Sequence, residues 1–157
     1  MLCEKILGPL SAFPGKIVDY VPIEWHEIHK RLHKKTSRGG VEIAIRLGDE
    51  ALSRGLRQDD VLGIEGDRAY AVNIPAFEVL VIRVDDQHQR MADRVCWEIG
   101  NKHAPLFWGE SGELITPYDM PVATLLSRLH GVRVEKQKRK VDFEKSISAS
   151  SGDHHHG

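Results

Sequence analysis

Residues 77–103 read FEVLVIRVDDQHQRMADRVCWEIGNKH, and this stretch decides the fold of the second half of the chain. Its first part, Phe77 to Val84, is an almost continuous apolar run, which predicts a buried strand. Asp85-Asp86 then supplies a helix start. Gly100 is well placed to end this helix, so residues 101–103 are expected to form a turn. The apolar face of the helix repeats at Met91, Val95 and Ile99.

The residues after this turn continue with two strands, a second helix and a last strand. The two strands, 103–108 and 113–116, are predicted on either side of a Gly-Glu-Ser-Gly turn. Asp119 opens the second helix, and the last strand begins at Val132. The order β-α-β-β-α-β predicts a ferredoxin-like domain over residues 76–138. The buried face of the second helix is expected to contain Val122, Leu125, Leu126 and Leu129.

The first half of the chain, residues 1–73, follows a different pattern. Trp25, Ile28 and Leu32 recur at helical spacing and predict a short amphipathic helix over residues 24–35. Elsewhere, short apolar runs are separated by turn residues, which favours a small β-sandwich or barrel-like domain. The whole chain is therefore predicted to be an α+β protein with two domains. The short strands are expected at 2–7, 17–21, 41–47, 61–64 and 69–72.

The last segment, residues 139–157, is polar and ends in His154, His155 and His156. It is predicted to be a flexible tail because it cannot bury enough apolar surface to fold. A purification tag is the alternative origin of the three histidines, but the flanking Asp153 and Gly157 favour a native end.

Composition and charge exclude several classes of function. The 157 residues carry a formal net charge of −1, which gives no reason to expect nucleic acid or an anionic membrane as partner. No apolar run approaches the roughly 20 residues that a membrane-spanning helix needs. Cys3 and Cys96 lack CxxC spacing, which argues against a disulfide framework and favours the cytoplasm. No phosphate loop, nucleophile elbow or HExxH motif is present, so an enzyme is not expected.

Histidine is the candidate metal ligand, because neutral imidazole binds nickel, copper and zinc. His103 follows a helix end and is expected to lie exposed at the edge of the sheet. One imidazole binds a divalent ion weakly, and a two-fold dimer would supply a second copy of His103. His154, His155 and His156 would add ligands to that ion or bind an ion by themselves. Solvated surface positions are expected for His26, His29, His33, His88 and His130.

The hexapeptide Glu98-Ile99-Gly100-Asn101-Lys102-His103 resembles the motif of the UreE family, the nickel metallochaperones of urease maturation. The similarity extends to Glu24-Trp25, to Glu42–Leu47 and to Leu56–Leu62 in the first half. It also includes Tyr118-Asp119 in the second half and the histidine-bearing end of the chain. The family motif usually has Arg where Lys102 stands, a change that keeps the charge.

The resemblance implies an N-terminal peptide-binding-like domain and a C-terminal metal-binding domain that dimerises. It also implies that His103 of each protomer binds Ni²⁺ at the dimer interface. The tail histidines would complete the set of ligands at this site or pass ions to it. Zn²⁺ or Cu²⁺ would be able to occupy the same ligands. The implied partners are the urease accessory GTPase and, through it, apo-urease. With only three tail histidines, the expected capacity is a few ions per dimer.

Three other functions are compatible with these residues. A nickel or zinc sensor or sequestering protein would use the same ligands without a delivery partner. A peptide-binding chaperone would keep its clients in the presence of a chelator. An RNA-binding ferredoxin-like module is the most remote alternative, because the basic run 133–140 lacks aromatic stacking residues and is better explained as a charged strand edge.

Overall fold

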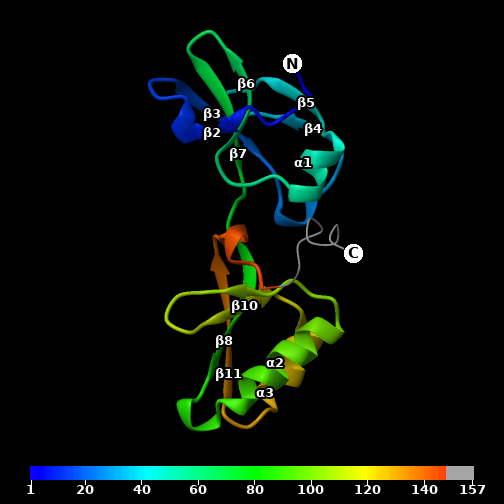
Figure 1. Ribbon diagram of the computed structural model, residues 1–157, viewed down its shortest axis with the longest axis vertical. Helices are drawn as coiled ribbons and strands as arrows, with labels where there is room; N and C mark the ends of the chain where they lie inside the picture. Colours follow the sequence, from blue (N-terminus) through cyan, green and yellow to red (C-terminus); the bar gives the residue numbers. More distant parts are fainter. Residues whose placement is uncertain (148–157) are drawn as a thin grey trace. The chain divides into compact units, whose positions relative to one another are not determined.

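The computed structural model describes residues 1–147 of the chain, which divide into two compact units. One unit contains residues 1–75, and the second begins at Ala76. The first consists mainly of strands and the second combines a four-stranded sheet with two helices (Figure 1). The predicted α+β class, with a small β domain followed by a ferredoxin-like domain, is confirmed. The candidate ligands His154, His155 and His156 lie outside the described residues.

The first unit contains two small sheets. One has the order β1-β5-β4, in which β4 (Leu32–Thr36) pairs antiparallel and β1 (Leu2–Cys3) parallel with β5 (Glu42–Arg46). In β5, Ile43 and Ile45 alternate with exposed residues and are buried, as the strict alternation predicts.

The second sheet of this unit has the order β2-β6-β7-β3. Its central hairpin consists of β6 (Asp60–Glu65) and β7 (Arg68–Asn73). The outer strands are β3 (Ile17–Pro22), parallel to β7, and β2 (Gly8–Pro9), antiparallel to β6. The remaining elements of the unit are η1 (Leu10–Ala12), η2 (Trp25–Glu27) and α1 (Asp49–Arg54).

Two predictions of secondary structure in this unit are wrong. Residues 24–35 do not form one helix, because only η2 is helical and the segment from Leu32 on is strand β4. Pairing with β5 overrides the weak helical spacing, and Leu32 is left 60% exposed. The strand predicted at residues 2–7 is confined to Leu2–Cys3, and Gly8–Pro9 forms a separate strand, β2.

His33 is buried rather than solvated, because it lies on the inward face of β4. Its Nε2 lies 2.8 Å from the carbonyl oxygen of Lys30, and its buried Nδ1 has no hydrogen-bond partner among residues 1–147. Burial lowers the pKa of His33 below its usual 6.5, although the hydrogen bond to the Lys30 carbonyl acts in the opposite direction. The folded unit therefore favours the neutral imidazole of His33 more strongly than the unfolded chain does.

We expect the first unit to lose stability as the pH falls below about 6.5. The unfolded chain takes up a proton at His33 in that range, whereas the folded chain resists protonation until a lower pH. Urea unfolding followed through the amide signals of Ile43 and Ile45 measures this dependence. His33→Leu is expected to remove it and the exposed control His26→Leu to keep it, so an unchanged slope in His33→Leu would refute the assignment.

The second unit has the topology that the sequence predicts. Its sheet has the order β11-β8-β10-β9 and every neighbouring pair is antiparallel. The strands are β8 (Phe77–Val84), β9 (Phe107–Trp108), β10 (Leu114–Pro117) and β11 (Val132–Arg139). The helices are η3 (Asp86–His88), α2 (Arg90–Asn101), α3 (Met120–Ser127) and η4 (Phe143–Lys145). This is the strand order of a split βαβ domain.

Helices α2 and α3 cover one face of the sheet (Figure 1). The strand β8 contributes Leu80 and Ile82 to the core beneath them, and α3 is capped by the Asp119 carboxylate, which accepts a hydrogen bond from the Val122 amide. The basic run predicted at a strand edge belongs to β11, which is an edge strand. The other strands add Leu114 of β10 and Val132 of β11, and the helices and loops supply Val95, Ile99, Leu106, Val122 and Leu126.

The opposite face of the sheet is covered by part of the segment predicted as a tail. Phe143 of η4 packs against Phe77 and Phe107, with ring centroids 6.4 and 5.2 Å apart. Ile147 donates a backbone hydrogen bond to the Leu106 carbonyl. Residues 139–147 are therefore structured, because the aromatic ring of Phe143 has an apolar surface to bury that composition alone does not reveal. No helix within residues 1–147 is long and apolar enough to cross a membrane.

Candidate metal site

His103 lies at the C-terminal end of α2, where it completes the helix cap. The amide of His103 donates to the Gly100 carbonyl at 2.9 Å, and the amide of Ala104 donates to the Ile99 carbonyl at 3.2 Å. This pair of hydrogen bonds is a Schellman motif, in which the capping residue adopts a left-handed conformation. That residue is His103, with a φ of 56°. Gly100, predicted to be the cap, lies inside the helix.

A histidine at this position is unusual, because glycine adopts the left-handed conformation with much less strain. The geometry places the imidazole on the surface, and His103 is exposed. No hydrogen bond or ion pair of its side chain occurs within residues 1–147. Both ring nitrogens are therefore available to a ligand.

The other predicted ligands, His154–His156, lie beyond the part of the chain that the structure describes. Among residues 1–147 there is no group of three or more His, Cys, Asp or Glu side chains arranged to hold a metal ion. A single imidazole is a weak ligand, so tight binding at His103 requires ligands from a second copy of the chain or from its C-terminal residues.

The outer face of the two helices exposes large apolar side chains. Trp97 on α2 is 61% exposed and Met120 at the start of α3 is 66% exposed. Arg94 of α2 and Met120 and Leu125 of α3 line a shallow pocket of about 490 Å³ on this face. Because Trp97 lies one turn after Arg94 on α2, the pocket and the indole share one side of the helix. Exposed apolar groups of this size are typical of protein interfaces.

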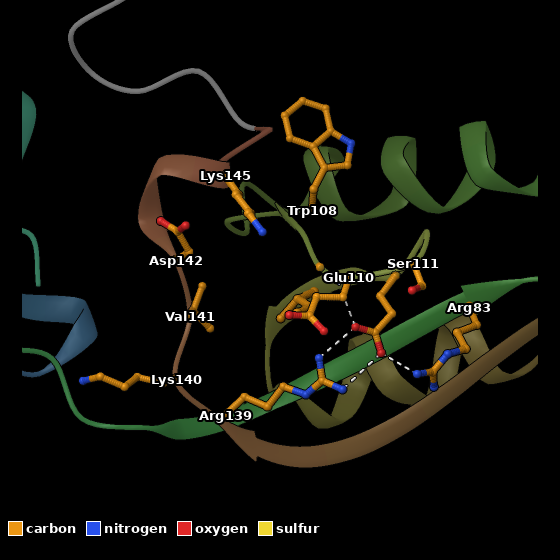
Figure 2. Close-up of a pocket in the computed structure, with 12 residues that line it drawn as sticks. Arg83, Trp108, Glu110, Ser111, Arg139, Lys140, Val141, Asp142 and Lys145 are labelled. Atoms are coloured by element: carbon orange, nitrogen blue, oxygen red, sulfur yellow. Dashed lines mark hydrogen bonds and ion pairs between the residues drawn. The ribbon is translucent and has the colours of Figure 1, made fainter.

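A buried ion-pair cluster organises the opposite face of the sheet (Figure 2). The side chain of Glu113, only 4% exposed, accepts hydrogen bonds from both terminal nitrogens of Arg139, at 2.8 and 3.0 Å. It also pairs with Arg83 and accepts a hydrogen bond from the Glu110 amide at 3.2 Å. The hydrogen bonds from Arg139 contribute most to lowering the pKa of Glu113 below its usual 4.5.

This cluster connects the last strand to the rest of the unit. Arg139 is the final residue of β11, and the pocket beside Glu113 is also lined by Val141, Asp142 and Lys145, which lead into and form η4 (Figure 2). The ion pair between Arg139 and Glu113 therefore holds the end of β11 in place, where the segment that leads toward the C-terminal histidines begins. Sequence reasoning missed Glu113, since its partners lie 26 and 30 positions away and no local pattern joins them.

The histidines of the first unit do not form a metal site. His29 directs Nδ1 to the Leu52 carbonyl oxygen at 2.9 Å, and its ring packs against Gly55. His26 is exposed and meets Trp25 edge to face, with centroids 5.7 Å apart. His33 is buried on a different element.

Comparison with known proteins gives matches over nearly the whole chain. Residues 3–75 match the model of the UreE urease accessory protein N-terminal domain, and residues 78–157 match that of the C-terminal domain. The chain is 40% identical over 153 residues to the urease accessory protein UreE of Helicobacter pylori strain G27, covering 96% of this chain and 88% of that protein.

Two further relatives carry the same description. The protein of Helicobacter acinonychis strain Sheeba is 39% identical over 154 residues, with 96% of this chain and 88% of the relative covered. That of Acetivibrio thermocellus is 38% identical over 109 residues, which cover 69% of this chain and 67% of the relative.

Proposed function

Because this chain belongs to the UreE family of urease accessory proteins, we propose that it is a nickel metallochaperone that carries Ni²⁺ for assembly of the urease active site. The family is one of accessory proteins for urease maturation and not of enzymes. The observation that carries the proposal is His103, a left-handed, exposed histidine whose ring nitrogens have no partner in the described chain.

The proposed site lies at the interface of a homodimer. Two copies of His103, related by a two-fold axis, would supply two imidazoles to one ion. The exposed Trp97 and Met120 support an interface on the helical face of the second unit. His154, His155 and His156 are proposed as additional ligands that reach the ion from the end of the chain. The proposed location is the cytoplasm, where the two free cysteines Cys3 and Cys96 remain reduced.

The proposed mechanism is capture, sheltering and transfer. Neutral imidazoles bind a borderline ion such as Ni²⁺, and the number of ligands that the chain offers is small enough to leave coordination positions open. An incoming ligand is able to enter at those positions, so the ion can pass to the urease accessory GTPase and to apo-urease. Imidazole ligands alone favour Cu²⁺ over Ni²⁺, and preference for nickel then depends on geometry, partners and metal supply.

The delivery step distinguishes this proposal from a sensor or a sequestering protein. We expect the nickel-loaded chain to activate apo-urease in the presence of the GTPase, GTP and a chelator that removes free nickel. His103→Gly is expected to activate little above the chelator background, whereas the exposed control His26→Ala is expected to match the parent. If the parent holds nickel but transfers none, the chain sequesters the ion. Equal activation by His103→Gly would refute the site.

A further inference from the structure

Strand β11 forms one edge of the sheet in the second unit, and no other strand among residues 1–147 pairs with its free side. All of its residues pair with β8 in one continuous register, from Val132 opposite Val84 to Arg139 opposite Phe77. The strand contains no proline and its register has no bulge, so two of the devices that natural proteins use to blunt an exposed edge are missing. The free side of β11 is therefore regular enough to accept a further strand.

The hydrogen bonds between β8 and β11 determine which backbone groups face this free side. The Asp85 amide donates to the Gly131 carbonyl at 2.8 Å, and these two residues continue the register of the strand pair. Opposed residues of an antiparallel pair alternate between pairs that exchange hydrogen bonds and pairs that do not. The odd-numbered residues of β11 therefore bond to β8. The even-numbered residues Val134, Lys136 and Lys138 direct their amides and carbonyls away from the sheet.

Two cations along this edge have no partner in the described part of the chain. Arg133 and Lys138 are both exposed, and neither side chain forms an ion pair or a hydrogen bond with residues 1–147. Successive side chains of a strand point to opposite faces of the sheet, so Arg133 and Lys138 lie on opposite faces. They are separated by roughly 17 Å along the strand.

Two other charged side chains of β11 already have partners in the second unit. Nζ of Lys136 lies 3.6 Å from a carboxylate oxygen of Glu78, the residue opposite Lys138 in the register. The carboxylate of Glu135 lies 4.0 Å from the guanidinium group of Arg83. The charges of β11 that lack an ion pair within residues 1–147 are therefore both positive, with one on each face.

A second copy of β11 is a poor match for this edge. A two-fold axis at the middle of the strand would place either Glu135 opposite Glu135 or Lys136 opposite Lys136. Like charges directly opposite on neighbouring strands are destabilising, whereas opposite charges stabilise the pairing. A strand with acidic side chains opposite Arg133 and Lys138 meets the favourable case at both positions. The charged edge therefore discriminates between strands rather than excluding all of them.

We propose that the free edge of β11 binds an extended, acidic segment of a partner protein as an additional strand. The outward backbone groups of Val134, Lys136 and Lys138 bond to the main chain of the segment and supply the affinity. Acidic side chains opposite Arg133 and Lys138 supply the selectivity. Binding at this edge needs no metal ion and no residue of the proposed nickel site. It goes beyond the proposed transfer function and does not depend on it.

Titration of the full chain with a synthetic peptide tests this proposal, with amide hydrogen exchange measured by NMR as the readout. The probe is a capped peptide as long as β11, with glutamate at its second and seventh positions and threonine elsewhere. Aligned with the whole strand, these glutamates lie opposite Arg133 and Lys138 in either direction of binding. The matched control peptide has lysine at both positions. We expect only the glutamate peptide to slow exchange at the outward amides of Val134, Lys136 and Lys138.

Two double variants complete the test. Arg133→Gln/Lys138→Gln is expected to weaken binding of the glutamate peptide by about fivefold, because it removes two charge pairs between the strands. The control Lys5→Gln/Lys30→Gln removes two exposed charges from the other unit and is expected to bind the peptide as the parent does.

Three results would overturn the proposal. The first is unchanged exchange at the three outward amides in the presence of millimolar glutamate peptide. The second is equal slowing by the lysine peptide, and the third is parental affinity in Arg133→Gln/Lys138→Gln. Slowing by single-stranded RNA but not by the peptide would assign the edge to nucleic acid instead.

Discussion

His103→Gly is expected to lower the affinity for nickel by about 100-fold or more, while the fold keeps its stability. Loss of outer-shell groups alone costs metal sites about 10- to 100-fold in affinity, and His103 is proposed as a direct ligand. Glycine adopts the φ of 56° found at this position with little strain. The variant therefore removes the imidazole and preserves the cap of α2.

His103→Ala serves as the matched control, because it removes the same ring but retains a Cβ atom in the left-handed conformation. Its free energy of unfolding is expected to be about 1 kcal/mol below that of His103→Gly. Nickel affinity is expected to be equally low in both variants. Urea unfolding and nickel calorimetry on the same samples separate the two effects. If His103→Gly keeps the affinity of the parent, the ligand set must be sought elsewhere.

Arg139→Met is expected to lower the free energy of unfolding of the second unit by about 3 kcal/mol. Glu113 is almost fully buried, and this change removes two of its hydrogen bonds while Arg83, about half exposed, remains as a partner. Lys138→Met on the same strand is the control. Since Lys138 is exposed, its replacement is expected to change the unfolding free energy by less than about 0.5 kcal/mol.

The double variant Glu113→Gln/Arg139→Met sharpens this test. Removing both charges leaves no uncompensated carboxylate, so the double variant is expected to be more stable than Arg139→Met alone. Urea unfolding of the parent, Arg139→Met, Lys138→Met and the double variant completes the comparison. If Arg139→Met is as stable as the parent, Glu113 does not hold β11 and the following segment in place.

The order of elements in the second unit follows from its sequence, because each signal there is local. The apolar run of β8, the Asp119 cap and the spacing in α3 each depend on neighbouring residues. The segment at 24–35 shows the limit of such signals. Three apolar residues at helical spacing do not outweigh the pairing of β4 with β5, which is a tertiary contact.

His103 was named from sequence as a candidate ligand, but its backbone conformation was not predicted. The Gly-Asn-Lys-His turn singles out His103, whereas the choice between Gly100 and His103 as the left-handed residue depends on where α2 ends. The contact of His88 with His130, whose rings meet edge to face with centroids 4.4 Å apart, was equally hidden, because the fold brings together two loops that the sequence separates. Each histidine alone has only an ordinary position at a helix end.

Nickel titration calorimetry combined with light scattering measures both the nickel stoichiometry and the oligomeric state, and so tests whether two copies of His103 share one ion. We expect a dimer that binds nickel tightly at one ion per two chains, with weaker binding by the remaining histidines at higher concentration. That tight phase is expected to vanish in His103→Gly and to persist in His130→Gln. A monomer that binds one nickel tightly per chain, or a tight phase that survives in His103→Gly, would contradict a shared interface site.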